Sequence, residues 1–143
     1  MRYPLLFSIL ISVFFLSCNK DKFNTKPSLK FKSVNTTTLQ QGGNLIFTLS
    51  FTDAEGDLTD NLVISKFEPN CIASRKDTIK YPLPAFPAGK NQKGDIIVTF
   101  DYNGIAPRCF PRNDTAVFKF VLRDKAQNSS DTALSPAIVI VNQ

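Results

Sequence analysis

Apolar and polar residues alternate with a period of two over much of the chain after residue 28. The clearest case is the segment 44–52, where Leu or Phe occupies every second position and mostly hydroxyl-bearing residues stand between them. A period of two places one face of a strand against a core and the other toward solvent. The same pattern predicts strands at 29–34, 62–67, 78–81, 95–102, 116–123 and 137–141.

Turns rich in Gly, Asn, Asp and Pro separate these segments, and no segment has a helical period long enough to predict a helix. About seven short strands with such turns are typical of an antiparallel β-sandwich. The chain has 13 Phe, 3 Tyr and no Trp, which indicates a core built from Phe. We therefore expect one all-β domain over residues 29–143.

The first eighteen residues have a different pattern. A basic start at Arg2 precedes the apolar stretch 5–16, and Ser17 and Cys18 follow it. This order is that of a secretory signal peptide. The stretch is shorter than the roughly twenty residues that a membrane span needs. Its ending, Phe15-Leu16-Ser17-Cys18, resembles the lipobox of bacterial lipoproteins, in the relaxed form of Bacteroidetes-type proteins.

The lipoprotein resemblance implies that residues 1–17 are removed and that Cys18 becomes a lipidated N-terminus. It implies anchorage to a membrane of the bacterial cell envelope, and the outer membrane is the expected one. The polar, Lys-rich residues 18–28 are then expected to be a flexible tether. An ordinary cleaved signal peptide and a membrane-spanning anchor are the alternatives.

Composition narrows the possible functions. The chain contains no His, which removes the most common general base and the His-containing zinc sites. The net charge of +5 is spread along the sequence without a basic and aromatic stripe, so we expect no nucleic-acid partner. The absence of His and Trp favours a non-catalytic binding or structural module with an envelope protein or glycan as partner. The alternative is an accessory subunit or a small carboxylate-based hydrolase acting on envelope glycans.

Two segments resemble turns of bacterial immunoglobulin-like modules. Residues 51–58, FTDAEGDL, end a strand in an acidic turn. Residues 120–130, FVLRDKAQNSS, are similar to the turn before the last strand of such modules, with Gln127 in place of the usual Gly. The resemblance implies an immunoglobulin-like strand order. It implies little about activity, because the same fold serves many functions.

The acidic turn is a candidate metal site. Three carboxylates lie close together around Gly56, and Ca²⁺ takes six to eight oxygen ligands. In an immunoglobulin-like sandwich the second turn lies at the same end and can add oxygens, as in the calcium-stabilised extracellular modules that these turns resemble. Calcium is the one cofactor that the sequence suggests. The alternative is a turn whose Asp and Gly serve only the backbone. The predicted calcium ligands are Asp53, Glu55, Asp57, Asp124 and Asn128.

The chain has three cysteines. Lipid on Cys18 leaves Cys71 and Cys109 as a pair, and an oxidising compartment permits a disulfide. We expect this bridge at the end of the sandwich opposite the acidic turn. It would close a loop of about 38 residues and stabilise the fold by roughly 3–4 kcal/mol. Free thiols and a metal pair are the alternatives.

Two segments outside the strands could carry a recognition surface, since loops often do so. One is the Pro-rich segment 81–94 with Phe86 in its middle. The other surrounds Tyr102 and Ile105, which we expect to be exposed. The alternative is that both segments are only long connectors.

Overall fold

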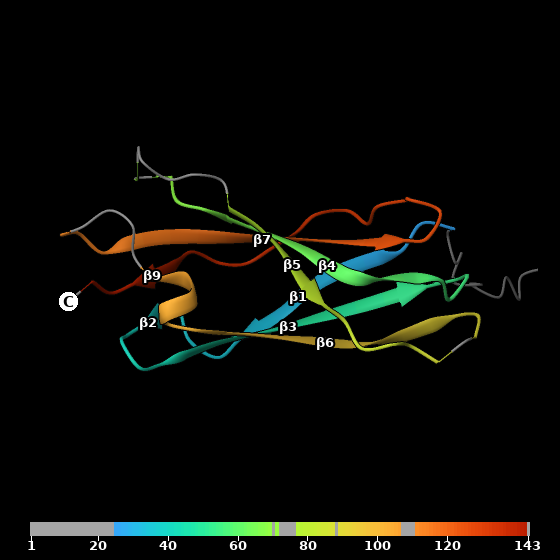
Figure 1. The fold of residues 1–143 in the computed structure, drawn as a ribbon, viewed down its shortest axis with the longest axis horizontal. Coiled ribbons are helices and arrows are strands. Elements are labelled where there is room, and N and C mark those ends of the chain that lie inside the picture. The colour runs from blue at the N-terminus through green and yellow to red at the C-terminus, as the bar shows by residue number, and fades with distance from the viewer. Residues whose placement is uncertain (1–24, 70, 72–76, 88, 107–110, 143) are drawn as a thin grey trace, which may run out of the picture.

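The computed structural model describes residues 25–69, 71, 77–87, 89–106 and 111–142. Two β-sheets pack face to face, and the strands run along the long axis of the molecule (Figure 1). The elements in chain order are β1 (Ser28–Val34), β2 (Thr38–Leu39), β3 (Asn44–Asp53), β4 (Leu58–Phe67), β5 (Asp77–Pro82), β6 (Gln92–Asp101), the short 3₁₀ helix η2 (Asn103–Ile105), β7 (Asp114–Asp124), β8 (Ala133–Leu134) and β9 (Ile138–Ile140).

The order of strands is immunoglobulin-like. One sheet has the order β1-β3-β6, and the other has the order β2-β9-β7-β4-β5 with β8 beside β7. Seven strands remain when the two-residue strands β2 and β8 are set aside. The first, second and fifth of these (β1, β3 and β6) form one sheet, and the other four (β4, β5, β7 and β9) form the second. This division is that of an immunoglobulin-like sandwich whose fourth strand joins the third. The predicted all-β sandwich of about seven strands is therefore confirmed.

Most predicted strands are present, with small differences at their ends. β6 begins at Gln92 and β4 at Leu58, both earlier than the sequence pattern indicated. The pairing of β4 with β7 shifts register between Leu58 and Leu62. This irregularity interrupts the alternation of side chains, which explains why the pattern showed only the later part of β4.

Phe residues from both sheets fill the space between them. Phe47 of β3 is fully buried, and its ring centroid lies 5.0 Å from that of Phe118 and 5.1 Å from that of Phe120, both on β7. The rings of Phe31 and Phe100 lie 6.5 and 6.4 Å from Phe47 in edge-on arrangements. Such tilted and edge-on pairs stabilise a core beyond the area they bury. The expected Phe-built core is confirmed.

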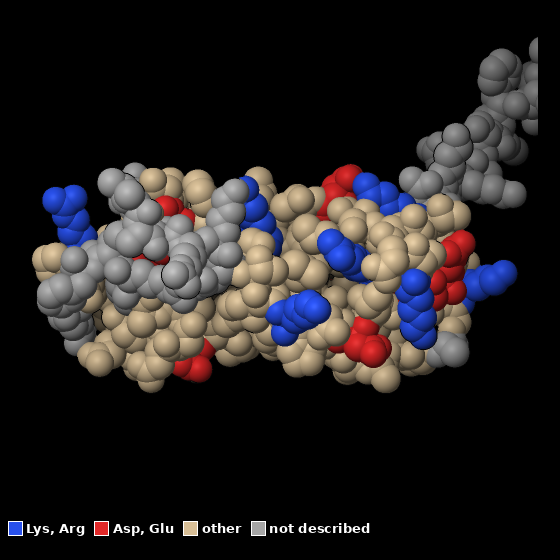
Figure 2. Space-filling model, turned by 45° about the horizontal axis from the view of Figure 1, so that its top comes forward, with Lys and Arg blue, Asp and Glu red and all other residues tan. Residues whose placement is uncertain are grey.

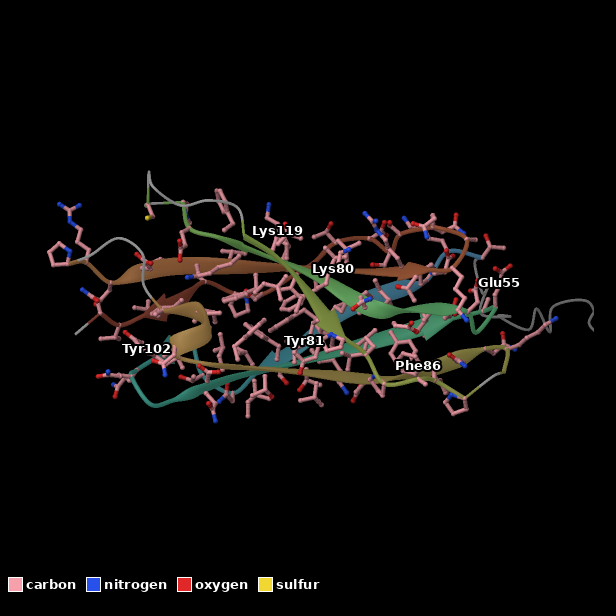
Figure 3. All side chains as sticks on the ribbon, in the orientation of Figure 1. Glu55, Lys80, Tyr81, Phe86, Tyr102 and Lys119 are labelled. Carbon is pink, nitrogen blue, oxygen red and sulfur yellow. The ribbon has the colours of Figure 1, made fainter. Side chains whose placement is uncertain are left out.

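The sandwich has two distinct ends, marked in Figure 3 by Glu55 and Tyr102. We call the end formed by residues 53–57 and 124–128 the acidic end. We call the other the far end, formed by residues 40–43, 68–69, 71 and 101–106. β1 begins at the acidic end, because Ser28 pairs with Thr52. No helix in the described part of the chain is long and apolar enough to cross a membrane.

Candidate functional site

The two turns predicted to hold calcium are neighbours. The backbone N–H of Lys125 donates a hydrogen bond of 2.9 Å to the carbonyl oxygen of Asp57. Leu58, the first residue of β4, pairs with Asp124, the last residue of β7. The expectation that the two turns share one end of the sandwich is therefore confirmed.

The second turn, residues 124–128, supplies hydrogen-bond donors to its own carboxylate, that of Asp124. Asp124 is fully buried, and Asn128 donates to both of its oxygens, through the backbone N–H at 2.7 Å and through Nδ2 at 2.8 Å. Gln127 has a φ of 69°, in the left-handed region, at the position where similar modules usually have Gly. Asp124 thus serves as the internal acceptor of a tight turn, because both of its oxygens already have donors.

The first turn leaves carboxylate oxygens without partners. Asp53 is 1% exposed, and its Oδ2 accepts a hydrogen bond of 3.0 Å from the backbone N–H of Asp57. The other oxygen, Asp53 Oδ1, is buried without a hydrogen-bond partner, and so is Asp57 Oδ1. Glu55 is exposed at the tip of the turn. Two of the three carboxylates therefore point oxygens into protein without any donor.

The end of the Pro-rich segment lies across this turn. The N–H of Asn91 donates a hydrogen bond of 2.9 Å to the carbonyl of Ala54. The carbonyl oxygen of Gly89 approaches Gly56 so closely that a Cβ there would lie 1.8 Å from it. Gly56 also has a φ of +71°. Both the close approach and the left-handed conformation require glycine at this position.

Gln92 is a member of the site that the sequence analysis missed. It is the cross-strand partner of Asp53 in the β3–β6 pair. Its Nε2 donates to the carbonyl oxygen of Pro87, while its Oε1 is buried without a partner. No motif marks this glutamine. It reaches the site through the register of β6 against β3, which the sequence pattern did not specify.

The chemistry of this turn fits a hard cation, since its unpartnered atoms are all oxygens. Within the described ranges, no three His, Cys, Asp or Glu side chains are grouped so that they could hold a metal ion. Of the four predicted acidic ligands, all within these ranges, no three are therefore close enough together to hold one metal ion. Calcium binding stays a prediction, and the relevant donors are two carboxylates and one amide.

The far end contains Cys71 and a buried ion pair. Cys71 is buried. Cys109 and Cys18 both lie outside the described residues, so the predicted pairing and the predicted lipidation are not tested. Lys66 and Glu68 are each 4% exposed and form an ion pair, and Lys66 Nζ also donates to the carbonyl of Ile105 at 3.1 Å.

Of the two predicted recognition segments, the one around Tyr102 packs its apolar side chains into the core, and the Pro-rich segment lines surface pockets. Tyr102 and Ile105 are buried, so the expectation that they are exposed is wrong. The hydroxyl of Tyr102 donates a hydrogen bond of 2.8 Å to the carbonyl of Val141, which fixes the ring against the core. In the Pro-rich segment, Phe86 packs on Phe51 with centroids 5.1 Å apart, and it lines two pockets of about 370 and 240 Å³.

Charges of both signs are interspersed on the face shown in Figure 2, and no large single-sign region is visible among its described residues. Asp131 is paired with Lys26 at 2.8 Å, and Asp95 with Lys32 at 2.7 Å. The hydrogen bond and charge of Lys26 hold the pKa of the Asp131 carboxyl below its usual value. This distribution agrees with the absence of a basic stripe in the sequence.

No family model matches the chain, and no curated protein matches it. Among solved structures, it is similar to the PKD domain of an M14-like peptidase from Thermoplasmatales archaeon SCGC AB-540-F20, with 13% identity and a TM-score of 0.45 over 82% of this chain and 94% of that one. It is also similar to a Niemann-Pick type C2 protein from the Japanese carpenter ant, with 12% identity and a TM-score of 0.45 over 79% of this chain and 92% of that one. A third likeness, to an alkylpurine DNA glycosylase from Pseudomonas fluorescens, has 10% identity and a TM-score of 0.49 over 82% of this chain and 31% of that one. These likenesses concern the fold alone.

Proposed function

We propose that the protein is a Bacteroidetes-type lipoprotein, anchored to the bacterial cell envelope by lipid on Cys18, that acts by binding or as a structural module rather than by catalysis. The observation that supports this best is the basic and apolar start of the chain that ends in Phe15-Leu16-Ser17-Cys18. The structure adds the point at which the chain enters the domain. Ser28 pairs with Thr52 at the acidic end, and Lys26 is held at 2.8 Å from Asp131. The residues that follow the lipobox therefore join the sandwich at one end.

This entry point brings the acidic end closer to the lipid than the far end. The expected flexible tether would still let the domain turn, so the acidic end is expected to lie nearer the membrane on average, with the far end further away by the length of the strands. Asn103, Gly104 and Arg112 are exposed on this side of the domain. We propose this exposed surface as the one that would meet an envelope protein or glycan. A lipoprotein anchor carries several acyl chains, which hold a protein to a membrane more firmly than the marginal binding of one chain.

We further propose that Cys71 pairs with Cys109. Cys71 is buried at the far end, and lipid on Cys18 would leave Cys109 as its one possible disulfide partner within the chain. The bridge would tie the segment after β4 to the segment before β7 at the far end. Thiol counting on the unfolded, unreduced protein tests this proposal. We expect no reactive thiol, and two reactive thiols per chain would overturn the pairing.

An intact mass of the membrane fraction tests the anchor, after expression of the full chain in a bacterium that processes lipoproteins. We expect the mass of residues 18–143 plus a diacylglyceryl or triacyl adduct. The Cys18→Ser variant is expected to lose the adduct. A cleaved, unlipidated wild-type mass would overturn the anchor.

The direction of the domain is tested with a fluorophore on Glu55→Cys or on Asn103→Cys, in vesicles that contain a nitroxide-labelled lipid. Both positions are exposed, so the two variants are matched. We expect stronger quenching at position 55 than at position 103. Equal quenching would overturn the proposed direction. Turnover of a chromogenic glycoside by the purified protein would instead support the hydrolase alternative.

A further inference from the structure

We propose that Asp53, Asp57 and Gln92 form a binding site for a hard divalent cation, with calcium as the ion that fits it. The site lies at the acidic end, between the first turn and the start of β6. This inference goes beyond the proposed function, because it holds whether or not the chain is lipidated. It also differs from the ligand set expected from the sequence.

The first support is the set of unpartnered oxygens. Asp53 Oδ1, Asp57 Oδ1 and Gln92 Oε1 are all buried without a hydrogen-bond donor. A buried carboxylate oxygen without a partner is strongly unfavourable, and buried charges in proteins are normally paired or bound to metals. Two carboxylates and one neutral amide oxygen in one region are a set of acceptors whose negative charge a cation would offset.

The second support is that the three side chains belong to one region. Asp53 and Gln92 are cross-strand partners, so their Cβ atoms lie about 4.5–5.5 Å apart on the same face of the sheet. Asp57 is tied to Asp53 by the hydrogen bond from its N–H to Asp53 Oδ2. Gly56 stands between the two aspartates in the sequence, and a Cβ added there would lie 3.3 Å from Nε2 of Gln92.

Gln92 is oriented to present oxygen. Its Nε2 is engaged by the carbonyl of Pro87, so its Oε1 is the amide atom that remains available. Asp53 is oriented in the same way, since one oxygen accepts the N–H of Asp57 and the other is left over. Backbone contacts of Gly89 and Asn91 with this turn hold β6 and the turn together.

The other expected ligands are less suited. Both oxygens of Asp124 are occupied by Asn128, and Glu55 is exposed. Carboxylate and amide oxygens are the ligands that calcium takes in proteins, and its flexible coordination tolerates an irregular set completed by water and backbone carbonyls. Magnesium requires a near-ideal octahedron, so a set of two carboxylates and one amide from three segments suits calcium better.

Thermal unfolding and calorimetry test the proposal, on the protein purified after expression of the full chain. Calcium sites of extracellular modules have dissociation constants of about 10⁻⁴–10⁻³ M. With about 10 mM calcium in place of chelator, we therefore expect the unfolding midpoint to rise by about 5–10 °C. Calorimetry should show one calcium ion bound per chain. A smaller shift is expected with magnesium.

The variants identify the ligands. Asp53→Asn and Asp57→Asn should each weaken calcium binding by about tenfold or more, because each replaces a charged ligand by a neutral one. Gln92→Glu should strengthen binding, because it adds a third carboxylate. This gain keeps the test informative if an aspartate variant does not fold. Glu55→Gln is the matched control, since it removes one charge from the exposed tip of the same turn and should leave binding unchanged.

Three results would overturn the proposal. The first is an absence of both calcium heat and a calcium-dependent midpoint in the wild-type protein. The second is calcium binding that the Glu55→Gln variant loses and the Asp53→Asn and Asp57→Asn variants keep. The third is an equal or larger response to magnesium, which would remove the assignment to calcium.

Discussion

Replacing Lys66 by Met tests the buried ion pair at the far end. Lys66 and Glu68 are each 4% exposed, and Lys66 Nζ contacts both the Glu68 carboxylate and the carbonyl of Ile105. Met keeps most of the packing of the lysine stem but removes the ammonium group. The buried carboxylate then has no cation and the carbonyl loses a donor. Breaking a buried pair in this way costs about 3–5 kcal/mol.

A loss of that size is a large part of the roughly 5–15 kcal/mol by which a domain is stable. We expect equilibrium denaturation of Lys66→Met to show a lower midpoint with little change in slope. Glu68→Leu should cost a similar amount, because it leaves the ammonium group buried and without its carboxylate.

The double variant Lys66→Met with Glu68→Leu separates the two explanations of such a loss. Replacing both charges by apolar groups is often close to neutral, so we expect it to cost about 1–2 kcal/mol, mainly from the carbonyl of Ile105. The double variant should thus be more stable than either single variant. Additive losses, or a loss below about 1 kcal/mol in Lys66→Met, would refute the reasoning.

Three further predictions follow from the core, the acidic end and the chain entry. Phe47→Ala should cost about 3–5 kcal/mol in a denaturation experiment, because the ring is fully buried among four others, and a cost under about 1 kcal/mol would contradict that packing. Gly56→Ala should be clearly more destabilising than Gly42→Ala in a denaturation experiment. Both positions have a positive φ, but only a Cβ at position 56 would meet a carbonyl oxygen, at 1.8 Å. Equal unfolding midpoints of the two variants would contradict the close approach. Lys26→Ala should raise the pKa of the Asp131 carboxyl toward 3.8, as measured by NMR titration. Because the pKa of Asp131 is lowered in the folded state, the pair stabilises the fold above the pKa of the unfolded state, and this stabilisation is lost as the pH falls through the pKa of the folded state. An unchanged Asp131 pKa in the variant would show that the pair does not form in solution.

The alternation of residues was enough to predict the sandwich. In β3 and β7 every second side chain is buried, and a segment with that period can bury its apolar face only as a strand. The two turns that resemble immunoglobulin-like modules also lie where the strand order placed them. By contrast, β2 and β8 have two residues each, which is too short to show any period.

Exposure near the ends of the sandwich was harder to predict. Tyr102 and Ile105 follow a strand and resemble loop residues, but the 3₁₀ helix η2 turns them back into the core. Lys66 stands at an inward position of β4, where a sequence pattern alone does not show that Glu68 and the carbonyl of Ile105 receive its charge.

The sequence alone determined the class of the fold, the Phe core and the position of the acidic turn, because these depend on local period and composition. Only the tertiary structure decided which oxygens of that turn have partners. Asn128 satisfies Asp124, while Gln92 reaches Asp53 from a strand far away in the chain. The register between two strands and the hydrogen bonds inside a turn depend on the whole packed sandwich, so the sequence pattern indicated an acidic site but not its members.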